Sequence, residues 1–169
     1  MANFELLKEL TQAWGVAGRE KAVRAIVLRE LEGHVDSAYV DNIGNIIAVK
    51  HGKGSPDSKK IMLSAHMDEI GLQVKKIESD GRIKVCSVGW VWTSALYNDQ
   101  VVFQNGVIGV VGCDGKIEDA KNDSGKLYID IGCTSKEDTE KYVKVGDYAG
   151  FVGPWYELQK GRISAQTFD

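Results

Sequence analysis

Apolar positions follow a helical period at the start of the chain. In residues 4–14 they recur every three or four positions, after an Asn3 that can cap a helix and before a Gly15 that can end one. A second stripe of the same kind fills residues 19–32, and Gly33 follows it. The pattern therefore predicts two amphipathic helices, one directly after the other.

The period then shortens to that of β-strands. Residues 38–40 and 45–49 are short apolar runs on either side of a polar turn at residues 41–45. Residues 61–65, Ile-Met-Leu-Ser-Ala, are apolar almost throughout, which is typical of a strand covered on both faces. We expect three strands here, the last of them buried.

From about Gly71 onward, short apolar stretches alternate with turn signals, which is the pattern of a β-barrel or sandwich. Residues 72–77 and 82–86 predict a hairpin around a turn at residues 78–81. Further strands are expected at residues 101–103, 107–111, 127–131 and 148–152. A capping-box pattern at residues 134–137 predicts a short helix that reaches about Tyr142.

A mixed opening of helices and strands that runs directly into a small all-β section indicates an inserted domain. We expect an α/β fold in which a partial mixed sheet carries this barrel-like insertion. The first domain then comprises residues 1–69 plus 163–169, and the inserted domain comprises residues 70–162.

Composition narrows the class of protein. The 169 residues fit one domain, or one domain and part of another, and 43% hydrophobic residues with only 2 Pro exclude disordered and collagen-like classes. A net charge of −3 argues against nucleic acid as a partner. No apolar run approaches the ~18 residues of a membrane span, and the first residues lack a signal-peptide pattern, so we expect no membrane contact and a cytoplasmic location.

The three cysteines, Cys86, Cys113 and Cys133, lack the paired spacing of a zinc knuckle or a redox dithiol. We expect them to be reduced and partly buried. His34 and His51 precede the segment that carries the candidate chemistry, and we expect both to be solvated surface residues.

The candidate chemistry lies in Ser64-Ala65-His66-Met67-Asp68-Glu69-Ile70-Gly71. His66 follows a predicted strand, and in an extended chain Asp68 points to the same side because side chains two positions apart share a face. A histidine that binds a metal through one ring nitrogen needs a partner for its other N–H, and a nearby carboxylate can be that partner. A histidine bonded to a carboxylate for structural reasons alone fits the same spacing, so both interpretations stay open.

Several motifs occur together in a recognisable order. These are Gly15-Val16-Ala17-Gly18-Arg19-Glu20, Asp41-Asn42-Ile43-Gly44-Asn45, Ala65-His66-Met67-Asp68-Glu69-Ile70-Gly71, Leu127-Tyr128-Ile129-Asp130-Ile131-Gly132, Ser135-Lys136-Glu137 and Gly146-Asp147. With them the chain resembles the dinuclear-metal aminopeptidases, which include glutamyl, deblocking and large tetrahedral aminopeptidases and some members named cellulase or endoglucanase. The third motif is the specific one, because each of the others is weak alone.

The resemblance implies a zinc-peptidase-like catalytic domain that removes residues from the amino end of peptide substrates with two divalent ions, zinc or cobalt. In that pattern His66 ligates one ion, Asp68 is the catalytic residue that supports the histidine, and Asp169 matches an aspartate that bridges both ions. No residue for binding the substrate is implied.

The glutamate that acts as general base in the family, and several further ligands, have no counterpart in this sequence. We therefore expect the chain to be the amino-terminal part of such an enzyme and to be inactive alone, with its metal site poorly filled. In such a part the apolar run at residues 61–65 should lack cover on one side, which would promote association. The resemblance also implies a homo-oligomer assembled through the inserted β domain, to which exposed Trp90 or Trp92 is suited.

Two alternatives remain. One is a non-enzymatic assembly module with a vestigial metal site. The other, ranked lowest, is a glycoside hydrolase that stacks sugars on Trp90, Trp92, Tyr97 and Trp155, and such an enzyme would also need two carboxylates facing each other across a cleft.

Overall fold

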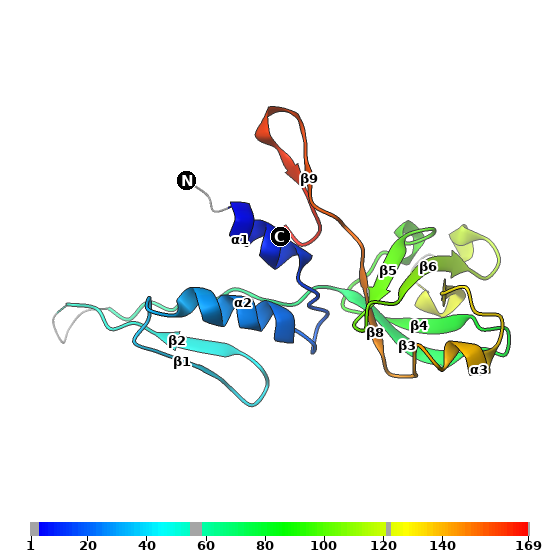
Figure 1. Ribbon diagram of the computed structural model, residues 1–169, viewed down its shortest axis with the longest axis horizontal. Helices are drawn as coiled ribbons and strands as arrows, with labels where there is room; N and C mark the ends of the chain where they lie inside the picture. The colour runs from blue at the N-terminus through cyan, green and yellow to red at the C-terminus, as the bar shows by residue number, and fades with distance from the viewer. Residues whose placement is uncertain (1–3, 55–58, 121–122, 169) are drawn as a thin grey trace.

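The computed structural model describes residues 4–54, 59–120 and 123–168. Along its long axis the molecule has a barrel at one end and a helix with a β-hairpin at the other (Figure 1). The first helix and a second, smaller hairpin lie between these ends. No helix in the described parts of the chain is long and apolar enough to cross a membrane.

Both predicted helices are present. They are α1 (Phe4–Gln12) and α2 (Lys21–Leu31), and Gly33 after α2 has a φ of +74°, the left-handed conformation that ends a helix. Asn3, the expected cap of α1, lies outside the described residues. The two helices are joined by Arg29, whose guanidinium donates two hydrogen bonds of 2.7 and 2.6 Å to the Glu9 carboxylate.

The first hairpin pairs β1 (Ser37–Val40) with β2 (Ile46–Val49) in antiparallel register, as the sequence predicts. Its turn is organised by Asp41, whose Oδ1 accepts hydrogen bonds from the backbone N–H groups of Ile43 at 3.0 Å and Asn45 at 2.8 Å. The strands lie largely exposed, so this hairpin forms without a core of its own.

The prediction of a buried strand at residues 61–65 is wrong. The segment has no regular secondary structure, and Ile61, Met62 and Leu63 are 84%, 88% and 92% exposed. A central strand exists only where neighbouring strands complete its hydrogen bonds and cover its faces, and no strand in the described parts of the chain does so here. The expected partial mixed sheet is likewise not observed among the described residues, where the first part of the chain forms only the β1–β2 ribbon.

The all-β section is a closed antiparallel barrel. Its strands are β3 (Gly71–Ile77), β4 (Ile83–Val88), β5 (Gln100–Phe103), β6 (Ile108–Cys113), β7 (Leu127–Asp130) and β8 (Tyr148–Phe151). Around the barrel their order is β3-β4-β7-β6-β5-β8, and β8 closes it by pairing with β3. All the predicted strands of this section are confirmed.

The main hydrophobic core fills this barrel. Alternate residues of each strand point inward, which places Leu72, Phe103 and Ile129 among the fully buried side chains. The short helix α3 (Lys136–Thr139) begins at Ser135, whose Oγ accepts a hydrogen bond from the Asp138 N–H at 3.2 Å. It ends before the expected Tyr142.

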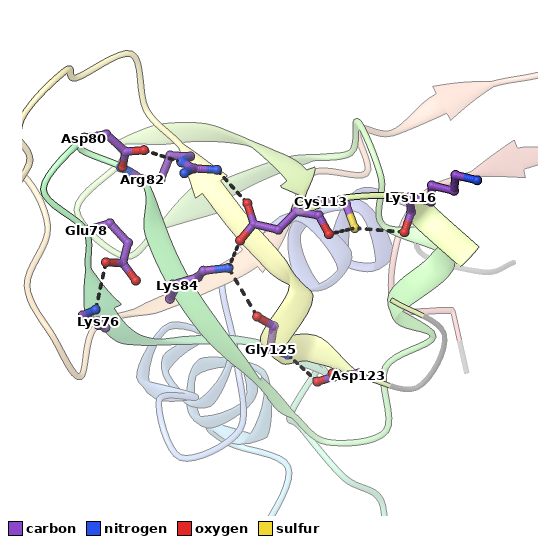
Figure 2. A network of polar contacts seen from close by, with 10 residues as sticks. Lys76, Glu78, Asp80, Arg82, Lys84, Cys113, Lys116, Asp123 and Gly125 are labelled. Atoms are coloured by element: carbon purple, nitrogen blue, oxygen red, sulfur yellow. Dashed lines mark hydrogen bonds and ion pairs between the residues drawn. The ribbon is translucent and has the colours of Figure 1, made fainter. Parts of the chain in front are cut away.

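Charged side chains just before and within β4 hold the loop that follows β6 (Figure 2). Asp114 accepts a 2.6 Å hydrogen bond from Arg82, and it also bonds to Lys84. Arg82 makes a further 2.7 Å bond to Asp80 and lies over the Tyr128 ring at 4.9 Å. Lys84 reaches the Gly125 carbonyl at the far end of the loop, at 3.3 Å. The charges therefore bind both ends of the loop to one strand.

The remaining described elements are short. They are the 3-10 helices η1 (Thr93–Ala95), η2 (Ile117–Ala120), η3 (Ser124–Lys126) and η4 (Gln159–Gly161), and the strands β9 (Tyr156–Glu157) and β10 (Ile163–Ser164). β9 and β10 form a hairpin outside the barrel, beside α1 in Figure 1. Gln12 of α1 donates a 3.1 Å hydrogen bond to the Gly153 carbonyl, so the chain leaving the barrel returns to the first helix.

Candidate metal site at His66 and Asp68

The segment with His66 lies where the first part of the chain meets the barrel. Its last residue before Ile70, Glu69, forms a parallel bridge with Val16 from the connection between α1 and α2. Two backbone hydrogen bonds make the bridge, from Glu69 N–H to the Gly15 carbonyl at 2.9 Å and from Ala17 N–H to the Glu69 carbonyl at 3.1 Å. Residues far apart in sequence thus fix this segment in place.

His66 and Asp68 point toward each other, as the extended spacing predicts. His66 Nδ1 lies 3.2 Å from Asp68 Oδ1 and 3.0 Å from the Asp68 backbone oxygen. Both neighbours are acceptors, so the Nδ1 atom carries the proton and donates to them. The Nε2 atom then keeps its lone pair, and with 60% of the side chain exposed it can meet a ligand from solution.

This arrangement provides one supported histidine ligand, which is part of what a metal site requires. A ligating imidazole whose other N–H is held by a carboxylate is the usual support for a metal-bound histidine. Among the described residues, however, no group of three or more His, Cys, Asp or Glu side chains is placed to hold a metal ion. A zinc site needs about three protein ligands, so these residues fit one ligand of a centre and not a complete one.

Asp169, the expected bridging aspartate, lies outside the described residues. The chain just before it does reach the site. A cavity of about 110 Å³ is lined by His66 and Asp68, by Leu10 and Ala13 of the first helical segment, and by Thr167. The amino-terminal, central and carboxy-terminal segments therefore meet at the candidate metal site.

Sequence reasoning assigns no role to Glu69, yet its side chain is part of this region. Its Oε1 atom accepts a hydrogen bond from the Gly15 N–H at 3.1 Å. Burial raises the pKa of the Glu69 carboxyl, and the bond from Gly15 acts against that rise. The only signal in the sequence is an acidic residue directly before the apolar start of a strand, which does not reveal the distant partner.

The other candidate residues lie elsewhere. His34 and His51 are exposed, as expected, and the three cysteines are free and partly buried. Trp90 and Trp92 are 83% and 66% exposed and contact each other edge to face, with ring centroids 6.1 Å apart. Tyr97 is half exposed, whereas Trp155 packs against Phe168 of the carboxy-terminal segment.

Known proteins share both the sequence and the fold. The family model for M42 glutamyl aminopeptidase matches residues 44–169, and a second model, AMPT, matches residues 2–26. A protein of Acetivibrio thermocellus provisionally named an aminopeptidase is 46% identical over 89% of this chain and 44% of its own length. The lysyl aminopeptidase of Pyrococcus furiosus is 31% identical over 100% of this chain and 51% of its own.

Solved structures agree with this match. A Thermotoga maritima protein described as an endoglucanase has a TM-score of 0.82 and 40% identity, over 96% of this chain and 49% of that one. The TET1 peptidase of Pyrococcus horikoshii, described as able to assemble into a tetrahedron or a large octahedral shell, has a TM-score of 0.74 and 34% identity, over 94% and 49%.

The similarity to these peptidases thus extends over the helices, the barrel and the His66-x-Asp68 segment of this chain. The chain belongs to the M42 glutamyl aminopeptidase family. It spans about half the length of the curated relatives that it matches.

Proposed function

We propose that this chain contributes to a metal-dependent aminopeptidase, a hydrolase that removes amino-terminal residues from peptides with two divalent ions, zinc or cobalt. The observation that carries the proposal is the His66–Asp68 pair, which leaves Nε2 free for a metal, in a chain of the M42 family. When bound, two such ions polarise the scissile carbonyl and activate a water molecule.

Within this function His66 would bind a metal ion through Nε2, and Asp68 holds the ring by accepting a hydrogen bond from the Nδ1–H. We assign Asp169 the bridging position. The described residues supply one imidazole ligand, and a hydroxide-generating centre needs more. We also propose that the 169-residue chain does not hydrolyse peptides by itself.

We further propose that residues 1–69 plus 163–169 belong to the catalytic domain and residues 70–162 to an assembly domain. The barrel strands, which all fall within residues 71–151, support this division. The cavity shared by His66 and Thr167 also supports it, because it joins the two ends of the proposed catalytic part.

Metal titration tests the site. We expect the chain to bind Zn²⁺ or Co²⁺ at least about tenfold more tightly than a His66→Ala variant, because the imidazole is the described ligand, and Asp68→Asn to lose about 10–100-fold as the ring loses its support. His34→Ala is the control, since His34 is exposed and no hydrogen bond or ion pair among the described residues joins it to His66 or Asp68. Equal affinity in the wild type and His66→Ala would contradict the metal role.

An activity assay tests the proposed inactivity of the isolated chain. We expect the purified chain to release no product from leucine or glutamate anilides, with or without added Zn²⁺ or Co²⁺. Turnover that a chelator removes and that a His66→Ala variant lacks would overturn the proposed inactivity, while supporting the proposed reaction.

The exposed Trp90–Trp92 pair favours a second candidate, a homo-oligomeric assembly module. Exposed tryptophans in contact are typical of interface anchors. Sedimentation of the chain and of a Trp90→Ser, Trp92→Ser variant tests it, and we expect only the variant to be monomeric. An unchanged oligomer in the variant would exclude this surface.

A further inference from the structure

The first part of the chain and the barrel meet at a tight joint, formed by Trp14, Gly15, Val16, Glu69 and Gly150. Trp14 donates its indole N–H to the Val102 carbonyl of β5 at 3.1 Å, so a side chain from the helical part binds directly to a barrel strand. A Cβ atom at Gly150 would lie 3.0 Å from the Trp14 indole nitrogen and 3.3 Å from Glu69 Oε1. Both side chains therefore pack directly on the backbone of β8.

Glu69 makes three hydrogen bonds in this joint. Its N–H donates to the Gly15 carbonyl at 2.9 Å, its carbonyl accepts from Ala17 at 3.1 Å, and its carboxylate accepts from the Gly15 N–H at 3.1 Å. Gly15 is thus held through both of its backbone polar groups by one residue. Among the described ion pairs none involves Glu69, so backbone N–H donation is what compensates the partly buried carboxylate.

The same peptide group connects this joint to His66. The peptide between Asp68 and Glu69 donates its N–H to the Gly15 carbonyl, and its own carbonyl oxygen accepts a hydrogen bond from His66 Nδ1, with 3.0 Å between nitrogen and oxygen. A peptide group is planar, so fixing its N–H also fixes the direction of its carbonyl. The orientation of the imidazole is therefore coupled to the attachment of Glu69 to Gly15.

We propose that Glu69 is a positioning residue, which orients the His66 imidazole for metal binding by holding the Asp68–Glu69 peptide against Gly15. This role rests on the proposed metal-binding function of His66. Glu69 itself touches neither the metal nor a substrate in this scheme.

Three substitutions at Glu69 separate positioning from simple burial. Glu69→Gln keeps an oxygen that accepts from the Gly15 N–H. Glu69→Asp keeps the charge but is one methylene too short to reach it, and Glu69→Ala removes the acceptor. Glu78→Ala is the matched control, because Glu78 is a partly buried glutamate whose side chain pairs with Lys76 away from His66.

Two measurements apply to each variant, after thermal unfolding has shown that it folds. The first is the Zn²⁺ dissociation constant, and the second is the pair of ¹⁵N chemical shifts of the His66 ring without metal, which report the tautomer. We expect Glu69→Gln and Glu78→Ala to stay within about threefold of the wild type. Glu69→Asp and Glu69→Ala should bind Zn²⁺ about tenfold or more weakly, as when the outer support of a ligand is removed.

In those two variants the ring shifts should also move toward a mixture of tautomers, an effect that burial alone does not produce. Unchanged Zn²⁺ affinity and unchanged ring shifts in Glu69→Asp would overturn the proposal, even if Glu69→Ala does not fold. If the wild-type chain bound Zn²⁺ no better than His66→Ala, the proposed function would fail, but the ring shifts would still decide the positioning role.

Discussion

At the scale of single residues, the structure depends on glycines where two backbones approach. Gly71 opens β3, and a Cβ atom there would lie 2.7 Å from Val16 Cγ1 and 2.8 Å from the Ala149 carbonyl oxygen. A carbonyl of a paired strand cannot move aside as a flexible side chain can. Gly71 therefore lets Val16 from the helical part seat against the barrel.

We predict that Gly71→Ala lowers the free energy of unfolding by about 1–3 kcal/mol, as overpacking does in a well-filled interior. Denaturant unfolding followed by tryptophan fluorescence measures it. Gly52→Ala is the matched control, since the nearest atom to its Cβ is 3.9 Å away, and its stability should be unchanged or slightly higher. Equal stability of the two variants would contradict this prediction, because it would mean that Val16 and its surroundings shift at little cost to make room for the methyl group.

The His66–Asp68 pair could be predicted from the sequence because it depends only on local geometry. Two residues apart on extended chain share a face wherever the segment lies, and their side chains meet at 3.2 Å. Glu69 could not be predicted, because its partner Gly15 is 54 positions away. Nothing in the local pattern indicates that these two segments pair.

At the scale of elements, Asp114 connects the loop after β6 to Lys84 of β4 and to Arg82 just before it (Figure 2). The hydrogen bond from Lys84, with a smaller contribution from Arg82, holds the pKa of the Asp114 carboxyl below its usual range. A carboxyl with a lowered pKa in the folded state stabilises the fold above its unfolded pKa, about 3.9, and this contribution disappears as the pH falls through the folded value.

We predict that Asp114→Asn is less stable than the wild type by about 1 kcal/mol at pH 6, and that this difference shrinks toward zero at pH 2. Chemical unfolding at a series of pH values measures it. Comparing the two proteins cancels the other carboxyls with shifted pKa values, including the raised pKa of Glu69. A difference that stays constant across this range would mean that the ion pairs of Asp114 do not stabilise the barrel.

The secondary-structure elements differ in how well a sequence pattern predicts them. The barrel strands were predictable because alternation and turn residues are local signals, and Asp41 or Ser135 marks a turn or a helix start by its own hydrogen bonds. The run at residues 61–65 has equally clear apolar character, but burial depends on what else is present to cover it. The exposure of this run in the structure therefore cannot be predicted from its own residues.

At the scale of the whole molecule, buried apolar contacts are unevenly distributed. The core cluster lies in the barrel, whereas the helical part buries few large side chains and leaves Ile61, Met62 and Leu63 uncovered. An uncovered run of this kind favours contact with other chains, both through its side chains and through its unpaired backbone. The molecule thus presents two apolar surfaces, this run and the Trp90–Trp92 pair.

We predict that the two surfaces have separable effects. Met62→Lys with Leu63→Lys should reduce the binding of a hydrophobic dye and the formation of large aggregates at high protein concentration, because the added charges oppose stacking of the run. Light scattering and dye fluorescence measure this, and the stability of the barrel should not change, since these side chains touch none of its core. The Trp90→Ser, Trp92→Ser variant is the control: it should lose the defined oligomer but still form large aggregates at high protein concentration, like the wild type. If the tryptophan variant suppressed aggregation and the lysine variant did not, the barrel surface would be responsible for the unspecific contacts.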